Sequence, residues 1–196
     1  LLRMLLMKLA NVVLFYTDRE IEEYREGMGK DDKRHIAALN NGIDNEHIMR
    51  LRAPYVAAER PKSLLFIGRL FEKCELETLL EALADPQIQD VHLHVIGDGP
   101  AAPVMKQLAV NLGIQDRVVW HGGTTDETKI AEIANQCRLF AFPGAVGLSL
   151  IHAMGYGLPA IINDNRWTNG PEITAFTDGE TGYAFRLGSF SDMAAK

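Results

Sequence analysis

The amino-acid sequence predicts an α/β fold in which a Rossmann-like parallel sheet is covered by helices on both faces. Short apolar runs alternate along the chain with segments whose apolar residues have helical spacing. Most of the runs are continuously apolar, which is typical of strands buried on both faces. Glycine-rich loops follow several of these runs, at the carboxyl ends of strands, where parallel sheets bind ligands.

The expected elements follow in chain order. We expect strands over residues 12–16, 35–39, 64–67, 91–96, 118–121, 139–142, 158–162 and 182–185. We expect helices over residues 1–10, 17–29, 76–84, 101–112, 124–136 and 149–157, with another beginning at the end of the chain. Thr17 with Glu20 and Thr124 with Glu127 have capping-box spacing, and Ser149 is the expected N-cap of its helix.

Composition limits the class of protein. A chain of 196 residues that is 47% apolar can form one full domain and part of another. A net charge of −6 without a cluster of Lys and Arg argues against nucleic acid as a partner. Two cysteines are too few for a disulfide framework and fit a reducing cytoplasm. We expect no metal and no cofactor.

The stretch from Arg138 to Glu172 predicts an anion site. An apolar run ends at Pro143, a glycine loop follows, and a helix then begins near Ser149. Unpaired amides at the start of a helix bind anions, and phosphate is the most common. The alternative is an ordinary strand-to-helix turn whose glycines serve tight geometry.

The residue pattern of this stretch resembles the donor-binding signature of the group 1 glycosyltransferases of GT-B architecture. The matching blocks are Gly147-Leu148, Ala153-Met154, Gly157-Leu158-Pro159 and Pro171-Glu172. Two positions depart from the pattern, since Gly144 and His152 stand where the family has glutamates. A branch of the family carries a similar P-G-x-V-G-L with a later histidine. In the family the second glutamate bonds the nucleotide ribose, and His152 is the candidate replacement. The alternative is a partly buried histidine with a structural role.

Two other blocks carry the resemblance. Gly68-Arg69-Leu70 matches the family's G-R-L, whose arginine and following lysine grip the donor diphosphate. Counting places Cys74 at the lysine position, and the nearest lysine is Lys73. The segment Val118–Gly122 is similar to a family strand whose backbone borders the nucleotide base.

A third glycine loop leaves two interpretations open. Gly97-Asp98-Gly99-Pro100 is similar to the family's G-x-G-P, and it also fits a dinucleotide fingerprint. No carboxylate follows directly at the end of the next strand, and Pro100 favours the glycosyltransferase. A nicotinamide oxidoreductase therefore remains an alternative.

The resemblance implies how the chain is organised. Residues 1–44 would be the tail of the acceptor-side domain, residues 45–62 a linker, and residues 63–196 the nucleotide-sugar-binding domain, truncated at its C-terminal end. The predicted catalytic residues are Arg69 and Lys73. The predicted donor-binding residues are Gly68, Gly97, Gly99, His121, Gly122, Gly144, Val146, Gly147, Leu148, Ser149, His152 and Glu172.

The implied reaction is retaining transfer of a sugar from a nucleotide diphosphate to a hydroxyl of a glycan, a polysaccharide or a lipid-linked sugar. We expect an excised piece that transfers no sugar alone. A binder of nucleotide sugars that does not catalyse is a further alternative. The resemblance implies a cytoplasmic protein and allows a location at the inner face of the membrane, with peripheral contact through the rest of the first domain.

Overall fold

The computed structural model describes residues 6, 9–27, 30, 32–40 and 42–196. Within it the chain forms two compact units, residues 1–42 and residues 43–196. Most of the helix expected over residues 1–10 lies outside the described residues. Among the described residues, no helix combines the length and apolar character needed to cross a bilayer.

The larger unit contains a six-stranded sheet in the order β5-β4-β3-β6-β7-β8, and every neighbouring pair is parallel. Its strands are β3 (Ser63–Ile67), β4 (His92–Ile96), β5 (Val118–Gly122), β6 (Leu139–Phe142), β7 (Ala160–Asn163) and β8 (Gly182–Phe185). The chain builds outward from β3 to β5 and then returns to place β6 on the other side of β3. The strand order therefore reverses between β3 and β6, and such a switch point is where open α/β sheets bind ligands.

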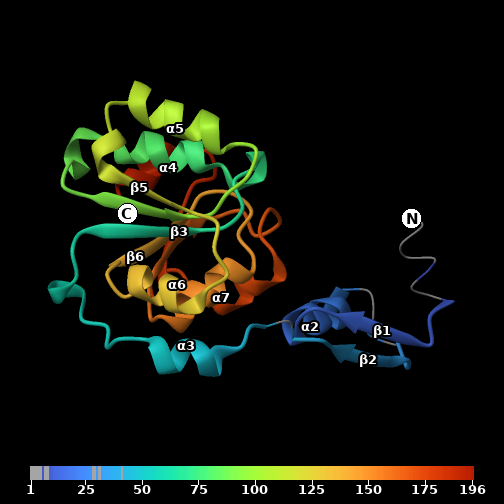
Figure 1. Cartoon of the computed structure of the whole chain (residues 1–196). Coiled ribbons are helices and arrows are strands. Elements are labelled where there is room, and N and C mark those ends of the chain that lie inside the picture. The colour runs from blue at the N-terminus through green and yellow to red at the C-terminus, as the bar shows by residue number, and fades with distance from the viewer. Residues whose placement is uncertain (1–5, 7–8, 28–29, 31, 41) are drawn as a thin grey trace. The chain divides into compact units, whose positions relative to one another are not determined.

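Helices cover both faces of this sheet, as predicted. They are α3 (Asn45–Leu51), α4 (Leu76–Leu83), α5 (Ala102–Asn111), α6 (Glu127–Ala134), α7 (Leu148–Gly155) and α8 (Phe190–Ala194). Figure 1 shows α4 and α5 on one face, and α6 and α7 on the other with α3 outside them. Short 3-10 turns over residues 57–59, 72–74, 86–88, 115–117 and 171–175 complete the unit.

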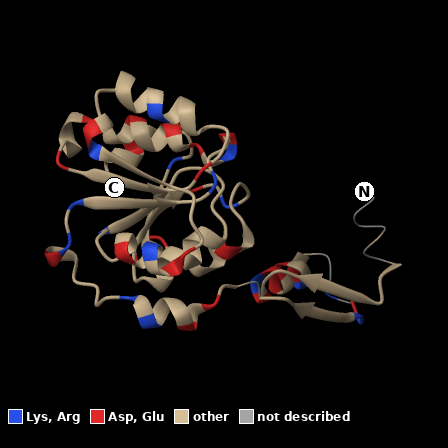
Figure 2. Cartoon of the chain, viewed as in Figure 1, with Lys and Arg blue, Asp and Glu red and all other residues tan. Residues whose placement is uncertain are grey.

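The core lies on both sides of the central strands. All five residues of β3 are buried. The rings of Phe66 on β3 and Phe142 on the neighbouring strand β6 stack, with 4.8 Å between their centroids. Figure 2 marks the Lys, Arg, Asp and Glu positions on the helices and loops, and the sequences of the six strands contain none of these residues. Burial of such uniformly apolar strands between two helical layers is the main favourable contribution to the stability of this fold.

Residues 45–62, which the sequence interpretation assigned to a linker, belong to the larger unit. Residues 45–51 form α3, in which Ile48 is only 2% exposed. Asn135, which follows α6, accepts a hydrogen bond from the Ala53 amide at 2.9 Å and donates one to the Leu51 carbonyl at 2.9 Å. Along the sequence, the boundary between the two compact units falls between residues 42 and 43. The assignment of the first unit to an acceptor-side domain stays a prediction.

Arg60 anchors the end of this stretch. Its side chain is buried, and its guanidinium donates to the Cys137 carbonyl at 2.8 Å and to the Ala134 carbonyl at 3.3 Å. The same group lies over the ring of Tyr55, 4.6 Å from its centroid. Burial lowers the pKa of Arg60. The sequence shows only an arginine before a proline, so these tertiary contacts could not be foreseen.

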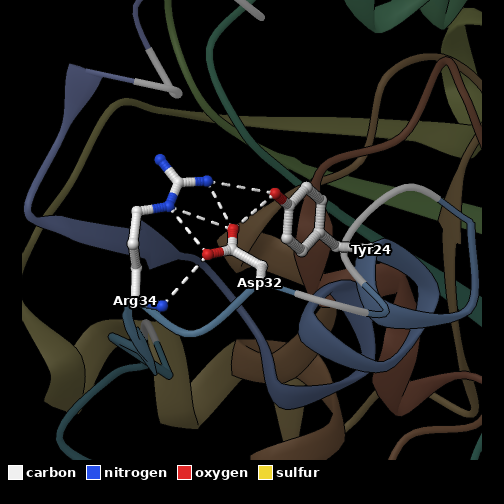
Figure 3. A network of polar contacts seen from close by, with 3 residues as sticks. All are labelled: Tyr24, Asp32 and Arg34. Carbon is white, nitrogen blue, oxygen red and sulfur yellow. Dashed lines mark hydrogen bonds and ion pairs between the residues drawn. The ribbon is translucent and has the colours of Figure 1, made fainter.

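The smaller unit contains the parallel strands β1 (Val12–Phe15) and β2 (His35–Ala38) with α2 (Asp18–Gly27) between them. A polar network joins the end of α2 to the start of β2 (Figure 3). Tyr24 donates to Asp32 at 2.8 Å, and Arg34 grips the same carboxylate through its Nε and Nη2 atoms. The Arg34 guanidinium holds the pKa of Asp32 well below its usual range.

One of the expected helix caps is confirmed and two are wrong. The Glu20 amide donates to Thr17 and the Thr17 amide to Glu20, which is the predicted capping box. At α6 the cap is Asp126, whose carboxylate accepts from the Thr128 amide at 3.1 Å. At α7 the N-cap position is Gly147, and Ser149 lies inside the helix. Because α6 starts at a different residue from the expected one, Thr124 accepts from the Asp126 amide at 3.1 Å and Glu127 contacts His152 on α7 instead.

We predict that Arg60→Ala lowers the free energy of unfolding of the chain by about 2–3 kcal/mol, since buried carbonyls lose a charged donor. Urea unfolding followed by circular dichroism measures this. Arg50→Ala is the control, because Arg50 is exposed on α3. A change below about 0.5 kcal/mol in Arg60→Ala would mean that residues 45–62 are not held by this contact.

Candidate functional site

The switch point is closed by backbone hydrogen bonds between two loops. The Gly144 amide donates to the Cys74 carbonyl at 3.1 Å, and the Ala145 amide donates to the Lys73 carbonyl at 2.9 Å. These bonds tie the loop after β6 to the 3-10 turn after β3. The two loops that flank the switch point therefore form one rigid rim at the carboxyl ends of the strands.

The glycines after β3 and β4 serve the packing of one loop on the other. A Cβ at Gly97 would lie 1.9 Å from the Gly68 carbonyl oxygen, and a Cβ at Gly99 would lie 2.3 Å from the Leu70 carbonyl oxygen. The Leu70 amide donates to the Asp98 carbonyl at 3.0 Å. Side chains at positions 97 and 99 would separate these loops, so the G-x-G pattern has a structural cause here whatever ligand binds nearby.

A cavity of about 650 Å³ opens beside this rim. Residues at the carboxyl ends of β3, β4 and β5 line it: Ile67, Gly68, Arg69, Ile96, Gly97, Asp98, Gly123, Thr124, Thr125 and Asp126. Arg69 is the cation of this lining, and its side chain is exposed and has no ion pair among the described residues. The carboxylate of Asp98 accepts a hydrogen bond from the Gly99 amide at 2.8 Å, and that of Asp126 accepts one from the Thr128 amide at 3.1 Å. The arginine is therefore available to an anion.

Neither Lys73 nor Cys74 lines this cavity. Lys73 is exposed, and its carbonyl is held by the loop after β6. Cys74 is 4% exposed, and burial raises the pKa of its thiol. The cysteine thus packs in the core, and the described residues that line the cavity include no cation besides Arg69. The role assigned to Lys73 stays untested.

The structure explains why glycine stands at position 144. A Cβ there would lie 2.1 Å from the Lys73 carbonyl oxygen and 2.6 Å from the Cys74 carbonyl carbon. These are backbone atoms that also form the hydrogen bonds of the rim. No side chain fits, and a glutamate at this position would break the contact between the two loops.

Two asparagines hold the same loop, and Asn163 has no part in the sequence interpretation. Asn163 is buried, and its side-chain amide donates to the carbonyls of Pro143 at 3.0 Å and Gly144 at 2.7 Å. Asn169 accepts from the Val146 amide at 3.1 Å. A signal was present, since Asn163 is the one polar residue that ends an otherwise apolar strand.

The helix α7 starts directly above this loop. Its N-cap, Gly147, has no side chain, so the N-cap residue itself offers the first amides of the helix no side-chain acceptor. Val146 is fully buried below, whereas Leu148 is exposed. Glu172 is 9% exposed, and its Oε2 lies 3.7 Å from where a Cβ of Gly147 would stand. The predicted residues of this stretch therefore gather around one loop, with the start of α7 at its end.

His152 contacts Glu127, which the sequence interpretation assigned to the capping box of the helix α6. Its Nε2 lies 2.8 Å from Oε1 of Glu127 on α6. The hydroxyl of Tyr156 donates to the same oxygen. Tyr156 is fully buried, and burial together with this bond raises the pKa of its phenol. The contact spans 25 residues of sequence, and no local pattern indicates it.

His121 does not line the cavity that holds Arg69. Its Nε2 lies 3.0 Å from Nδ1 of His94, and both rings face a second cavity of about 530 Å³ beside α6. Burial lowers the pKa of both imidazoles. The cavities share Gly123 and Thr124 in their linings. Gly122, whose φ of +73° favours glycine, accepts from the Gly97 amide at 2.8 Å.

Among the predicted residues, Gly68, Arg69 and Gly97 thus line one cavity, and the residues of the stretch 144–152 surround the adjoining rim. The chemistry available at this edge is that of anion binding. A guanidinium without an ion pair among the described residues and the start of a helix with a glycine N-cap lie at the ends of neighbouring strands.

Comparison with known proteins gives the family. A family model described as "Glycosyl transferases group 1" matches residues 48–196. A curated relative, the N-acetyl-alpha-D-glucosaminyl L-malate synthase of Bacillus anthracis, is 28% identical over 165 residues, which cover 81% of this chain and 42% of the relative. The present chain therefore spans less than half of that protein.

Solved structures share the fold. A lipopolysaccharide outer core galactosyltransferase in its apo form matches with a TM-score of 0.73 and 23% identity, over 95% of this chain and 51% of that chain. A pneumococcal O-GlcNAc transferase in complex with UDP and GlcNAc matches with a TM-score of 0.72 and 22% identity, over 95% of this chain and 37% of that chain. These matches confirm the predicted Rossmann-like α/β fold.

We predict that Gly144→Ala lowers the free energy of unfolding by about 1–3 kcal/mol, the usual range for overpacking, because its Cβ meets backbone atoms. Gly144→Glu, which introduces the family's glutamate, should be at least as damaging. Thermal and urea unfolding measure both. Gly27→Ala is the control, since no atom lies within 4 Å of a Cβ there. Wild-type stability in Gly144→Ala would show that the rim yields easily and that steric exclusion does not explain the glycine.

Proposed function

The chain belongs to the glycosyl transferases group 1 family, and we propose that its larger unit binds the nucleotide diphosphate of a sugar donor at the switch point. The observation that carries this proposal is the placement of Arg69 after β3 and of the start of α7, whose N-cap is a glycine, after the neighbouring strand β6. A diphosphate between them would receive a fork of hydrogen bonds from the guanidinium and amide bonds from the helix.

The proposed reaction is transfer of the sugar to a hydroxyl of an acceptor with retention of configuration. Negative charge grows on the departing diphosphate as the glycosidic bond breaks. Donors that are fixed in place stabilise that charge without reorganising during the reaction. Arg69 and the amides of α7 supply such donors from this chain. The acceptor, a glycan or lipid-linked sugar, would be held mainly by parts of the protein outside residues 43–196.

The nucleoside would occupy the cavity of about 650 Å³ next to Arg69. Uracil is the first base to test, because the pneumococcal O-GlcNAc transferase of the same fold is in complex with UDP. The identity of the sugar is left open. A cytoplasmic location, the absence of a cofactor and contact with a membrane stay predictions.

A second candidate function is supported by the buried Cys74. If catalysis requires a second cation beside Arg69, the chain would bind a nucleotide sugar without transferring the sugar. An assay of sugar transfer in a protein that includes the complete acceptor-side domain separates the two candidates. The 196-residue chain itself is expected to transfer no sugar.

Calorimetry of the chain with UDP, GDP, uridine and NAD tests the proposed binding site. We expect at least one of the nucleoside diphosphates to bind and uridine to bind more weakly, because the nucleoside lacks the diphosphate. NAD is expected to bind less tightly than that diphosphate. NAD binding tighter than both diphosphates would instead support the oxidoreductase alternative.

Arg69→Ala is expected to weaken binding of the preferred diphosphate by about 1.5–3 kcal/mol, the range for a hydrogen bond to a charged group. Uridine binding should change little, since the nucleoside carries no charge for Arg69. Arg50→Ala, which removes an exposed cation from α3, is the matched control. Equal losses for uridine and the diphosphate would show that Arg69 acts through the fold.

A further inference from the structure

A bulge in the edge strand β5 lies next to the cavity proposed for the nucleoside. Two successive residues of β4 pair with Trp120 and Gly122, so His121 between these partners is an extra residue. Such a bulge bends its strand and re-aims the residues that follow it. The next residues, Gly123 and Thr124, line the cavity of about 650 Å³. The geometry of the bulge therefore determines where this wall of the cavity lies.

Backbone contacts connect the bulge to the loop that follows β4. The Gly97 amide donates to the Gly122 carbonyl at 2.8 Å. A Cβ at Gly123 would lie 3.3 Å from the Cβ of Asp98, so the two loops also touch there. Gly97 in turn packs against the Gly68 carbonyl in the loop after β3. A shift of the bulge would therefore move one wall of the cavity relative to the others.

A hydrogen bond between two histidines spans the bulge. Nε2 of His121 lies 3.0 Å from Nδ1 of His94, which is on β4. One ring donates its N–H, and the other accepts through the lone pair of its nitrogen. His94 is partly buried, whereas His121 is exposed. The bond thus ties the extra residue of the edge strand to the neighbouring strand at the point where regular pairing is interrupted.

The surroundings of the two rings favour their neutral forms. Lys129 and Glu132 on α6 line the same cavity of about 530 Å³ as the rings, and His92 lies two residues before His94 on β4. Burial lowers the pKa of both imidazoles, and the neighbouring rings of His121 and His92 lower that of His94 further. Above the ordinary histidine pKa of about 6.5, both rings are therefore neutral and share one proton between them.

We propose that His94 and His121 are positioning residues of the donor site: their hydrogen bond holds the bulge of β5, and the bulge holds the cavity wall at Gly123 and Thr124. This inference rests on the proposed function, because the wall belongs to the cavity that would receive the nucleoside. It gives His121, which is absent from the lining of that cavity, a role that requires no contact with the ligand.

The bond between the two rings is sensitive to acid. One added proton leaves the bond intact, since a protonated ring donates to a neutral one. A second proton leaves two donors and no acceptor, so the bond breaks. Because the pKa values of both rings are lowered, the bond is complete at neutral pH and is lost as the pH falls below about 6.5 and the second ring takes its proton.

Calorimetry of the 196-residue chain at neutral pH, with UDP or GDP, whichever binds more tightly, tests the positioning role. His94→Phe keeps a ring but removes the nitrogen, and His121→Ala removes the exposed partner. Each should weaken binding about threefold to tenfold, as expected for the loss of one neutral hydrogen bond. The double variant should bind no more weakly than the weaker single variant, because both remove the same bond.

Amide substitutions should preserve binding. His94→Asn places an amide near the position of Nδ1, and His121→Gln places one near the position of Nε2. An amide both donates and accepts, so each variant should bind the diphosphate within about twofold of the wild type. His92→Asn, which changes the exposed histidine nearby on β4, is the control and should keep the wild-type affinity.

The pH dependence separates positioning from a purely structural role. An amide bonds to its partner ring in either protonation state, so His94→Asn should bind as the wild type does at neutral pH and more tightly than the wild type at acid pH. Protonation of the diphosphate affects both proteins alike and cancels in this comparison. Melting temperatures establish that each variant is folded, and His121→Ala, at an exposed position, serves where His94→Phe is not.

Three results would overturn the proposal. Both disrupting variants could bind as tightly as the wild type, the amide variants could bind as weakly as the disrupting ones, or the wild type and His94→Asn could show the same pH dependence. In each of these cases the nucleotide still binds and the proposed function stands. If neither UDP nor GDP binds the wild type, the proposed function fails and this inference fails with it.

Discussion

The close approach of three loop backbones at the carboxyl edge of the sheet is the constraint on which the candidate site depends. The loop after β3 touches the loop after β4 at Gly97 and the loop after β6 at Gly144. Each contact is so short that a Cβ would meet a carbonyl group. Since Arg69 lies in the first of these loops and α7 begins at the end of the third, the backbone packing sets the distance between the two groups that would bind a diphosphate.

This constraint gives a physical meaning to the departures from the family pattern. At position 144 a side chain has no space, so the change from glutamate accompanies a rim that is closed by backbone bonds. At position 152 a histidine on α7 lies with its Nε2 2.8 Å from Oε1 of Glu127 on α6. Cys74 stands where the family pattern has a lysine, and it is buried away from the cavity. Among the described residues, no other cation joins Arg69 in the lining of that cavity.

Much of the fold could be predicted from local patterns because its strands are continuous apolar runs and its turns contain glycine. The strands and helices of residues 63–196 agree with the expected ones to within a few residues. The helix α3 could not be predicted, because Ile48 is buried in the core and Asn135, 84 residues beyond Leu51, binds the Leu51 carbonyl at the end of the helix. The caps of α6 and α7 were predicted wrongly for a related reason. Several polar residues lie near each helix start, and packing decides where the helix begins. The site was predicted as a set of loops, whereas the pairing of Glu127 with His152 required the structure.

The most direct test of this account is a titration of the ¹⁵N-labelled chain with UDP and GDP, followed by assignment of the amide resonances that shift. The account predicts shifts that converge from two segments distant in sequence, the loop containing Arg69 and the start of α7 at Leu148 and Ser149, with smaller shifts around Thr124. Shifts confined to the opposite edge of the sheet, around Ser63, Leu139 and Met193, where another cavity of about 210 Å³ lies, would contradict it.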